Sequence, residues 1–204
     1  MTFTNKNSIV MFDLSGVFFN EGLKVAVKKI SERFGLEPAK IEYVLNGDFA
    51  KEYRTGLVEP DEFWKKAKSE LKIQKTAELA LIFFSSYHPN LKTVDLLSKL
   101  RKAGIKTGYL SNSPKDRTKY LDAKYMFLAM FDFGLCSYEA HAWKPDVEFF
   151  EIFLKKFKIR AQNVIYIEDK EQHLKPALDL GMATVLYKST DRLEVKLRNM
   201  GLKF

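Results

Sequence analysis

The sequence has a single cysteine, Cys136, among 204 residues, and only 6 prolines and 10 glycines. One cysteine cannot form an intramolecular disulfide or build a thiolate metal site, so we expect a protein of the reducing cytoplasm. The low proline and glycine content, with no repeat or low-complexity tract, excludes a disordered or fibrous chain. A chain of this length with 46% hydrophobic residues is long enough for one packed domain with a modest insertion.

The sequence also lacks a long uninterrupted apolar run near its beginning. The stretch SIVMF ends at Asp13, so it is too short for a membrane helix or for the apolar part of a signal peptide. We therefore expect neither membrane insertion nor export.

An excess of negative charge is absent as well, because the formal net charge is +8. A positive field attracts anions, either a phosphorylated metabolite or a nucleic-acid backbone. The lysines occur in amphipathic patterns such as FWKKAKSELK and LSKLRKAGIK, which are typical of solvated helix faces. No nucleic-acid recognition motif accompanies the charge, so nucleic acid is the least favoured ligand.

The spacing of apolar residues divides the chain into two kinds of structure. Residues 8–12 predict a buried strand that runs into a tight loop at Gly16. From Glu21 to about Tyr87 only helical spacing occurs, in four successive segments. After residue 88 strand-like and helix-like spacing alternate. We expect strands at 105–110, 133–136, 164–167 and 183–187. We expect helices at about 91–103, 116–125 and 145–157, and a further helix that ends at Leu180.

Alternating strands and helices with short loops favour a parallel sheet covered on both faces. The sequence therefore predicts an α/β fold with a Rossmann-like parallel sheet core, formed by residues 1–17 and 88–204. Residues 18–87 are expected to form a small inserted four-helix cap. The oligomeric state is left open.

Polar residues directly follow several of the apolar runs. In parallel sheets reactive groups gather past the carboxyl ends of the strands, and this rule selects four places. They are Asp13, Ser111 with Asn112, Lys144, and Glu168 with Asp169.

The segments around these residues form a recognisable set. FDLSGV, LSNS, KPDVEFF and YIEDKEQHLKPALDLGM, in this order, resemble the four motifs of the haloacid dehalogenase-like hydrolases. The resemblance covers essentially the whole chain and implies a phosphatase that forms an aspartyl-phosphate on Asp13. It further implies that Ser111 and Asn112 donate hydrogen bonds to the phosphoryl group and that Lys144 holds negative charge.

The resemblance also implies a magnesium site. Mg²⁺ prefers oxygen ligands and keeps several waters, so Asp13, the backbone carbonyl of Ser15 and Asp169 would be a sufficient protein contribution. Glu168 would support the metal waters or orient Lys144.

The first motif departs from the family pattern at Ser15. Most phosphatases of this family carry a second aspartate there, which protonates the leaving oxygen and then activates water. A subgroup of the family reads FDLGGV or FDLGNV at this motif and also lacks the aspartate. It includes sugar-phosphate phosphatases and the phosphatase-like domain of epoxide hydrolases, and this chain resembles it through the EYRTGLVEPDEFW and KPDVEFFE segments. In the fourth motif Lys170 and His173 also depart from the pattern, and neither is assigned a role.

The predicted cap carries candidate substrate residues in FAKEYRTG, namely Lys51, Tyr53 and Arg54. These side chains would meet an anionic or hydroxylated substrate if the cap closes over the site. The alternative is that Tyr53 packs between helices and that both basic side chains are solvated.

Two functions follow from the sequence. The favoured one is a Mg²⁺-dependent phosphatase that acts on a small phosphorylated metabolite, for example a sugar phosphate, through Asp13. The alternative is a phosphate-binding or protein-interaction module on the same fold that lost its general acid and base with Ser15.

Overall fold

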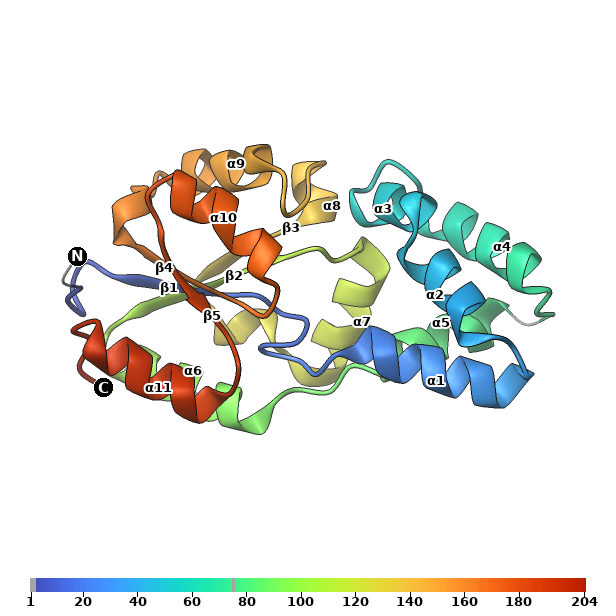
Figure 1. Ribbon diagram of the computed structural model, residues 1–204, viewed down its shortest axis with the longest axis horizontal. Helices are drawn as coiled ribbons and strands as arrows, with labels where there is room; N and C mark the ends of the chain where they lie inside the picture. The colour runs from blue at the N-terminus through green and yellow to red at the C-terminus, as the bar shows by residue number, and fades with distance from the viewer. Residues whose placement is uncertain (1–2, 75) are drawn as a thin grey trace.

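The computed structural model describes residues 3–74 and 76–204. Within this part, five parallel strands form one sheet in the order β3-β2-β1-β4-β5 (Figure 1). The order confirms the predicted α/β fold with a Rossmann-like parallel sheet. The strands are β1 Ile9–Phe12, β2 Lys106–Ser111, β3 Phe133–Cys136, β4 Val164–Glu168 and β5 Ala183–Leu186.

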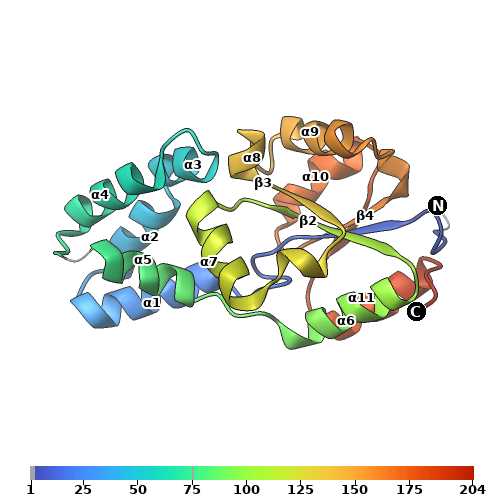
Figure 2. The ribbon, with the colours of Figure 1, turned by 180° about the vertical axis from the view of Figure 1, so that it is seen from behind.

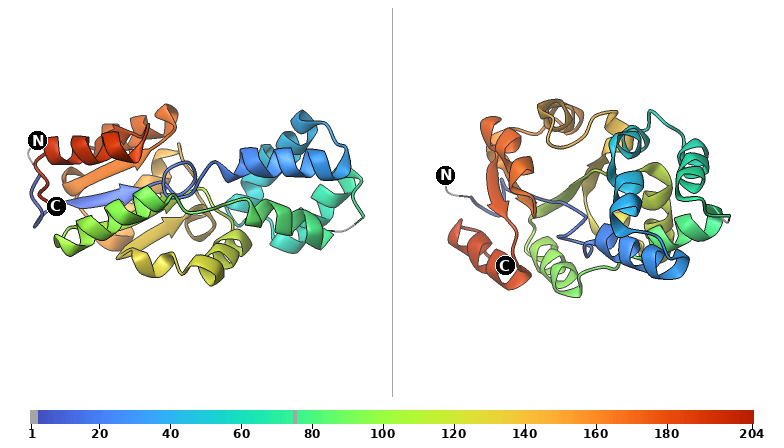
Figure 3. Two further views of the ribbon diagram at one scale, coloured as in Figure 1. Left: turned by 90° about the horizontal axis from the view of Figure 1, so that it is seen from below. Right: turned by 45° about the vertical axis from the view of Figure 1, so that its right-hand side comes forward.

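Helices cover both faces of the sheet, as predicted. Helices α6 (Leu91–Lys102) and α11 (Thr190–Asn199) lie on one face, and α9 (Val147–Phe157) and α10 (Glu171–Asp179) lie on the other (Figures 1 and 3). Because successive strand residues point to opposite faces, each strand contributes to two cores.

The two cores are visible in the middle strand. Phe12 is fully buried in the cluster that contains Leu97 of α6, whereas its neighbour Met11 belongs to the cluster that contains Phe150 of α9. A parallel strand buried on both faces needs a continuous apolar run, which explains why SIVMF was a sufficient signal for β1.

Five helices between β1 and α6 lie together beyond the carboxyl ends of the strands, and we call them the inserted helices (Figures 1 and 2). The four predicted helices are present, and a short fifth one, α3, lies among them. Its seven residues follow Gly47 and are too few for helical spacing to stand out. The domain boundaries at residues 18 and 87 stay a prediction. The inserted helices are α1 Gly22–Phe34, α2 Pro38–Asn46, α3 Asp48–Arg54, α4 Pro60–Leu71 and α5 Thr76–Ser85.

The strands and helices after residue 88 follow the alternation that the sequence predicts. Helix α11, after the last strand, was not predicted. None of the helices in the described ranges is both long and apolar enough to cross a membrane. The other short elements are α7 Lys115–Tyr125, η1 Leu128–Met130, α8 Ser137–Ala140 and η2 Ala161–Asn163.

An aromatic stack holds the inserted helices together. The rings of Phe63 in α4 and Tyr53 in α3 are parallel, with centroids 3.9 Å apart, and Trp64 meets the ring of Phe63 edge-on at 5.0 Å. Phe63 is 1% exposed, so its removal leaves a cavity at the centre of this unit.

We predict that Phe63→Ala lowers the free energy of unfolding by about 3–5 kcal/mol, because it loses buried apolar surface and the cavity cannot collapse fully. Tyr43→Ala is the matched control, since Tyr43 is an aromatic residue of α2 that is 73% exposed. Urea denaturation measures both variants, and an equal effect of the two would contradict this packing.

Candidate active site

The carboxyl ends of β1, β2 and β4 face the inserted helices across a cavity of about 200 Å³. Its walls come from both sides, because loops after the strands supply one part and the inserted helices supply the other. The lining residues are Asp13, Ser15, Leu23, Asn46, Arg54, Tyr87, Ser111, Asn112, Arg117, Trp143, Lys144, Pro145, Lys170, Gln172 and His173.

Lys144 lies at the floor of this cavity and is 1% exposed. Its Nζ donates to Oδ1 of Asp13 at 2.8 Å, to Oε2 of Glu168 at 2.7 Å and to the backbone oxygen of Leu110 at 2.9 Å. The hydroxyl of Tyr166 lies 2.9 Å from the same Nζ and donates to Oε2 of Glu168 at 2.5 Å. One buried ammonium thus joins the ends of three neighbouring strands.

The charges in this cluster shift each other's pKa values. Burial alone would lower the pKa of Lys144, but the negative charges of Asp13 and Glu168 raise it above its ordinary value. Burial alone would raise the pKa of Glu168, but the Lys144 ammonium and His173, whose Nδ1 is 3.2 Å from Oε2, hold it well below the usual range. Lys144 and Glu168 therefore form a stable ion pair.

The carboxylates of Asp13, Glu168 and Asp169 converge, since one oxygen of each lies within 4.8 Å of the others. Burial, with Glu168 adding repulsion, raises the pKa of Asp13 to about 6, and burial beside Glu168 and Asp13 raises the pKa of Asp169 to about 8. Oδ1 of Asp169 is buried and has no hydrogen-bond partner among the described residues. An oxygen-rich cluster with an unsatisfied carboxylate oxygen fits a hard divalent cation such as Mg²⁺.

Gly16 allows Asp169 to approach the loop after β1. Its φ angle of +87° lies in the left-handed region, and an added Cβ would collide with the carboxylate of Asp169. The glycine in FDLSGV therefore brings the loop of Ser15 next to Asp169, as the predicted metal site requires.

Asn112 fastens the loop after β2 to the segment that carries Lys144. Its side-chain amide donates to the backbone oxygen of Lys144 at 2.8 Å, and its Oδ1 accepts from the backbone nitrogen of Lys144 at 2.9 Å. This two-way contact occupies the Asn112 side chain. The backbone of this loop and the hydroxyl of Ser111 are then the groups left to face a ligand.

The structure brings most of the sequence-predicted residues together. Lys51 and Tyr53 do not line the cavity: Nζ of Lys51 lies 4.5 Å from the centroid of the Trp143 ring, and the Tyr53 hydroxyl donates to Asp116 at 2.5 Å. The predicted residues at the cavity or in the carboxylate cluster are Asp13, Ser15, Arg54, Ser111, Asn112, Lys144, Glu168 and Asp169.

Sequence reasoning missed Arg117, Tyr87 and Trp143, which also line the cavity. Arg117 carried a signal, because it lies in the first turn of α7, directly after the LSNS segment. The positive end of the helix dipole disfavours a cation there, so a basic residue at this place suggests a role beyond helix stability. Tyr87 and Trp143 carried no comparable signal.

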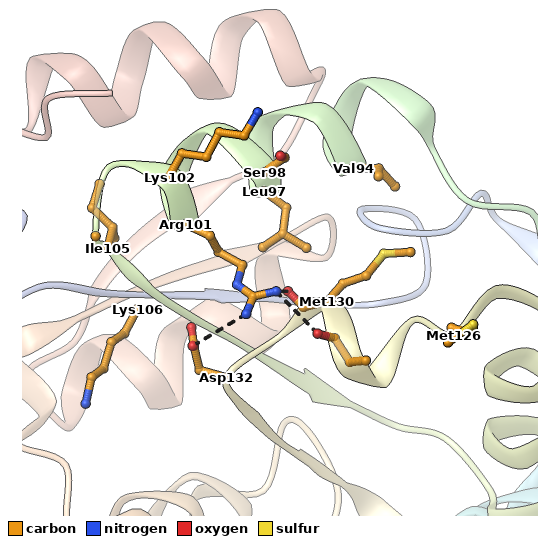
Figure 4. Close-up of a pocket in the computed structure, with 12 residues that line it drawn as sticks. Val94, Leu97, Ser98, Arg101, Lys102, Ile105, Lys106, Met126, Met130 and Asp132 are labelled. Atoms are coloured by element: carbon orange, nitrogen blue, oxygen red, sulfur yellow. Dashed lines mark hydrogen bonds and ion pairs between the residues drawn. The ribbon is translucent and has the colours of Figure 1, made fainter.

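A larger cavity of about 720 Å³ lies elsewhere, at the amino ends of β2 and β3 (Figure 4). Arg101 at its centre donates to the backbone oxygen of Met130 at 2.8 Å and lies 3.9 Å from Asp132. The guanidinium group of Arg101 is thus already bound by groups of the protein. Among the described residues, convergent carboxylates and a buried lysine occur at the smaller cavity and not at this one, so we place the candidate active site at the smaller cavity.

Comparisons with known proteins found a matching family and similar structures. The sequence profile of the haloacid dehalogenase-like hydrolases matches residues 8–181. A sesquiterpene phosphatase of Aspergillus oryzae is 24% identical over 175 residues, covering 84% of this chain and 85% of that protein. The bifunctional epoxide hydrolase 2 of Sus scrofa is 23% identical over 201 residues, covering 89% of this chain but 36% of that enzyme, so the chain spans about a third of its length.

A solved structure shows the same fold. It is an aspartate-to-alanine mutant of a HAD family enzyme of Bacteroides thetaiotaomicron in complex with magnesium and inorganic phosphate. The TM-score is 0.74 at 23% identity, and the match covers 89% of this chain and 94% of that one.

We predict that Lys144→Met lowers the free energy of unfolding by about 3–5 kcal/mol at neutral pH, because it leaves two buried carboxylates without a counter-ion. In the unmodified protein the pKa of Glu168 is depressed, so its ionised form stabilises the fold above the ordinary pKa of 4.5. This contribution is lost as the pH falls through the depressed pKa. The difference between variant and wild type should therefore shrink as the pH falls below about 4.5.

Denaturation in EDTA across a pH series measures this difference. Lys155→Met is the control, because Lys155 is an exposed lysine of α9. A destabilisation by Lys144→Met that does not change with pH would contradict the ion-pair account.

Proposed function

This chain belongs to the haloacid dehalogenase-like hydrolases, and we propose that it is a Mg²⁺-dependent phosphatase that hydrolyses a small phosphorylated metabolite through Asp13. The observation that carries the proposal is the convergence of Asp13, Glu168 and Asp169 beside the buried ammonium of Lys144. Phosphoryl transfer requires a nucleophile, a cation to offset phosphate charge and donors for the phosphoryl oxygens. All three requirements can be met within one cavity.

Asp13 is the nucleophile in this proposal. Its carboxylate oxygen attacks phosphorus, the bond from phosphorus to the leaving oxygen breaks, and the leaving group departs with the electron pair. Water then attacks the aspartyl-phosphate and releases inorganic phosphate, which regenerates the carboxylate. Lys144 donates to Oδ1 of Asp13, so it favours the ionised form and directs the second oxygen toward the cavity.

The cation would be held by Asp13, the backbone carbonyl of Ser15 and Asp169. Glu168 would remain paired with Lys144 next to these ligands. When bound, Mg²⁺ supplies charge neutralisation for the phosphoryl oxygens. The Ser111 hydroxyl and the backbone near Asn112 donate hydrogen bonds to the same oxygens as charge develops on them.

Two comparisons support a phosphatase reaction. A relative in Aspergillus oryzae is a phosphatase by name, and the Bacteroides enzyme of the same fold was solved with magnesium and inorganic phosphate. The cavity of about 200 Å³ is smaller than the roughly 300–1,000 Å³ of sites for drug-sized ligands, which favours a small metabolite.

We predict that Asp13→Asn abolishes Mg²⁺-dependent phosphate release, with a loss of roughly a thousandfold or more in kcat, because the amide cannot act as nucleophile. The assay uses p-nitrophenyl phosphate, sugar phosphates and nucleotides, each with Mg²⁺ or with EDTA. EDTA should suppress the wild-type activity to the level of the variant.

Asp95→Asn is the control for this experiment, because Asp95 is an exposed carboxylate of α6 that does not line the cavity. If purified wild-type protein binds phosphate but releases none from any compound of the panel, the protein is the non-catalytic binding module instead. Equal activity of wild type and Asp13→Asn would refute the proposed nucleophile.

Ser15 generates a separate prediction, because a serine hydroxyl does not titrate near neutral pH and cannot serve as the usual general acid and base. Without this help, substrates with a weakly basic leaving oxygen are favoured. Ser15→Asp should therefore raise kcat/KM for an alkyl phosphate by about a hundredfold relative to p-nitrophenyl phosphate.

The slope of log kcat/KM against leaving-group pKa, measured for both proteins, checks this prediction. A steep slope in wild type should become shallow in Ser15→Asp. Ser15→Ala is the matched control, and its slope should equal that of wild type. Identical slopes for wild type and Ser15→Asp would show that leaving-group protonation does not depend on this position.

A further inference from the structure

Two buried arginines from different parts of the chain line the candidate active site. Arg54 ends α3 among the inserted helices, and Arg117 lies in the first turn of α7 on the sheet side. Their side chains belong to residues that are 7% and 4% exposed. Arginine is rarely buried to this extent unless a partner compensates its charge.

Within the part of the chain that the structure describes, both guanidinium groups meet neutral acceptors. Arg54 donates to Oδ1 of Asn46 at 2.8 Å and to the backbone oxygen of Leu45 at 2.6 Å. Arg117 donates to the hydroxyl of Tyr87 at 2.8 Å and to the backbone oxygen of Asn112 at 3.0 Å.

A third contact of Arg117, from Nε to the Ser113 hydroxyl at 3.3 Å, is neutral as well. In residues 3–74 and 76–204, neither guanidinium forms an ion pair with a carboxylate. Each guanidinium has five N–H donors, so both retain donors that can turn to a ligand in the cavity they line.

The two positive charges also act on each other. Burial, together with the positive charge of Arg117, lowers the pKa of Arg54 to about 10. Removing cations from water without a counter-ion is unfavourable, and the repulsion between them adds to this. A ligand that carries negative charge would relieve both effects.

The charges of the whole cavity indicate how much negative charge a ligand brings. The two charges of a bound Mg²⁺ and the one of Lys144 would balance the three carboxylates Asp13, Glu168 and Asp169. Arg54, Arg117 and Lys170 are then the cations that face the substrate. A phosphoryl dianion offsets two of these three charges, so one positive charge is left for another anionic group.

We propose that Arg54 and Arg117 bind a carboxylate on the leaving part of the substrate, so that the substrate class is the phosphate esters of small organic acids. This inference rests on the proposed phosphatase function. A carboxylate fits the observations better than a second phosphate, because the cavity is small and the planar oxygens match the guanidinium fork.

The alternative is that Arg117 only fastens the loop of Asn112 and Ser113, and that Arg54 only fastens the end of α2. Such a purely structural role would affect all phosphate esters alike. The discriminating quantity is therefore the ratio of affinities for two esters that differ in the carboxylate alone. Phosphoglycerate and glycerol phosphate are such a pair, because a carboxylate in one replaces a hydroxymethyl group in the other.

Inhibition of p-nitrophenyl phosphate hydrolysis measures both affinities without depending on the leaving group. We expect the inhibition constant of phosphoglycerate to be roughly 10- to 100-fold lower than that of glycerol phosphate, as for charge-assisted hydrogen bonds. In Arg54→Gln and in Arg117→Gln this ratio should fall to near 1. Arg54→Lys keeps the charge and should retain part of the preference.

Arg192→Gln is the matched control, because Arg192 is an exposed arginine of α11, and its ratio should equal that of wild type. Titration calorimetry of the same pair in the presence of Mg²⁺ covers variants whose activity is too low to inhibit. Circular dichroism shows which variants are folded, and the ratio is measured on those.

The outcomes separate this inference from the proposed function. If p-nitrophenyl phosphate is hydrolysed but wild type binds both esters equally, the carboxylate site is refuted and the phosphatase stands. A preference that persists unchanged in both glutamine variants refutes the role of these arginines. If no ester is hydrolysed, the proposed phosphatase function fails. Equal calorimetric affinities for phosphoglycerate and glycerol phosphate would then refute the carboxylate site as well.

Discussion

The ammonium of Lys144 is the interaction on which the candidate site depends. It is 1% exposed and contacts Asp13 after β1, the backbone of Leu110 in β2 and Glu168 at the end of β4. Without this charge, two of the three convergent carboxylates would repel each other in a buried place. The hydrogen bonds of Asn112 to the backbone of Lys144 fix the position of the ammonium, and the parallel register of the strands brings its partners together.

The inserted helices are positioned by contacts close to the same cavity. The Ser137 hydroxyl donates to the backbone oxygen of Arg54 at 2.5 Å, and Nδ1 of His141 lies 3.0 Å from the backbone oxygen of Thr55. Asp116 of α7 accepts hydrogen bonds from Tyr53 and from Trp64. Each contact joins the inserted helices to a loop or helix that follows a strand. The end of α3 is therefore held where Arg54 reaches the cavity, while Tyr53 is used to build the interface and is not free to meet a ligand.

The sequence predicted the sheet and the polar residues after its strands more fully than the cavity lining that the inserted helices and α7 supply. Buried parallel strands require apolar runs, so β1 and β4 were visible, and polar residues directly after them marked Asp13 and Glu168. The short helix α3 was not visible, because seven residues contain too few turns for a period to emerge. Arg117 was missed although its place in the first turn of α7 was a signal, because an arginine in a charged helix is also typical of a solvated face and only tertiary packing buries it. Lys51 and Arg54 are three residues apart in the sequence, yet only Arg54 lines the cavity, and this difference depends on where α3 docks.

Two unusual features of this chain have a common physical consequence. Ser15 places a hydroxyl, which does not titrate near neutral pH, where a carboxyl group could protonate the leaving oxygen. In the proposed reaction, Arg54 and Arg117 add positive charge that the phosphoryl group alone does not use. Binding energy from a part of the substrate that does not react can be used to orient and desolvate the reacting centre, and this raises kcat when the interaction strengthens in the transition state. As the bond from phosphorus to the leaving oxygen breaks, negative charge moves onto the leaving part, toward any anionic group that the arginines hold. In the proposed reaction, buried guanidinium groups on that side would therefore stabilise the departing anion by electrostatics, which would partly replace the proton that Ser15 cannot supply.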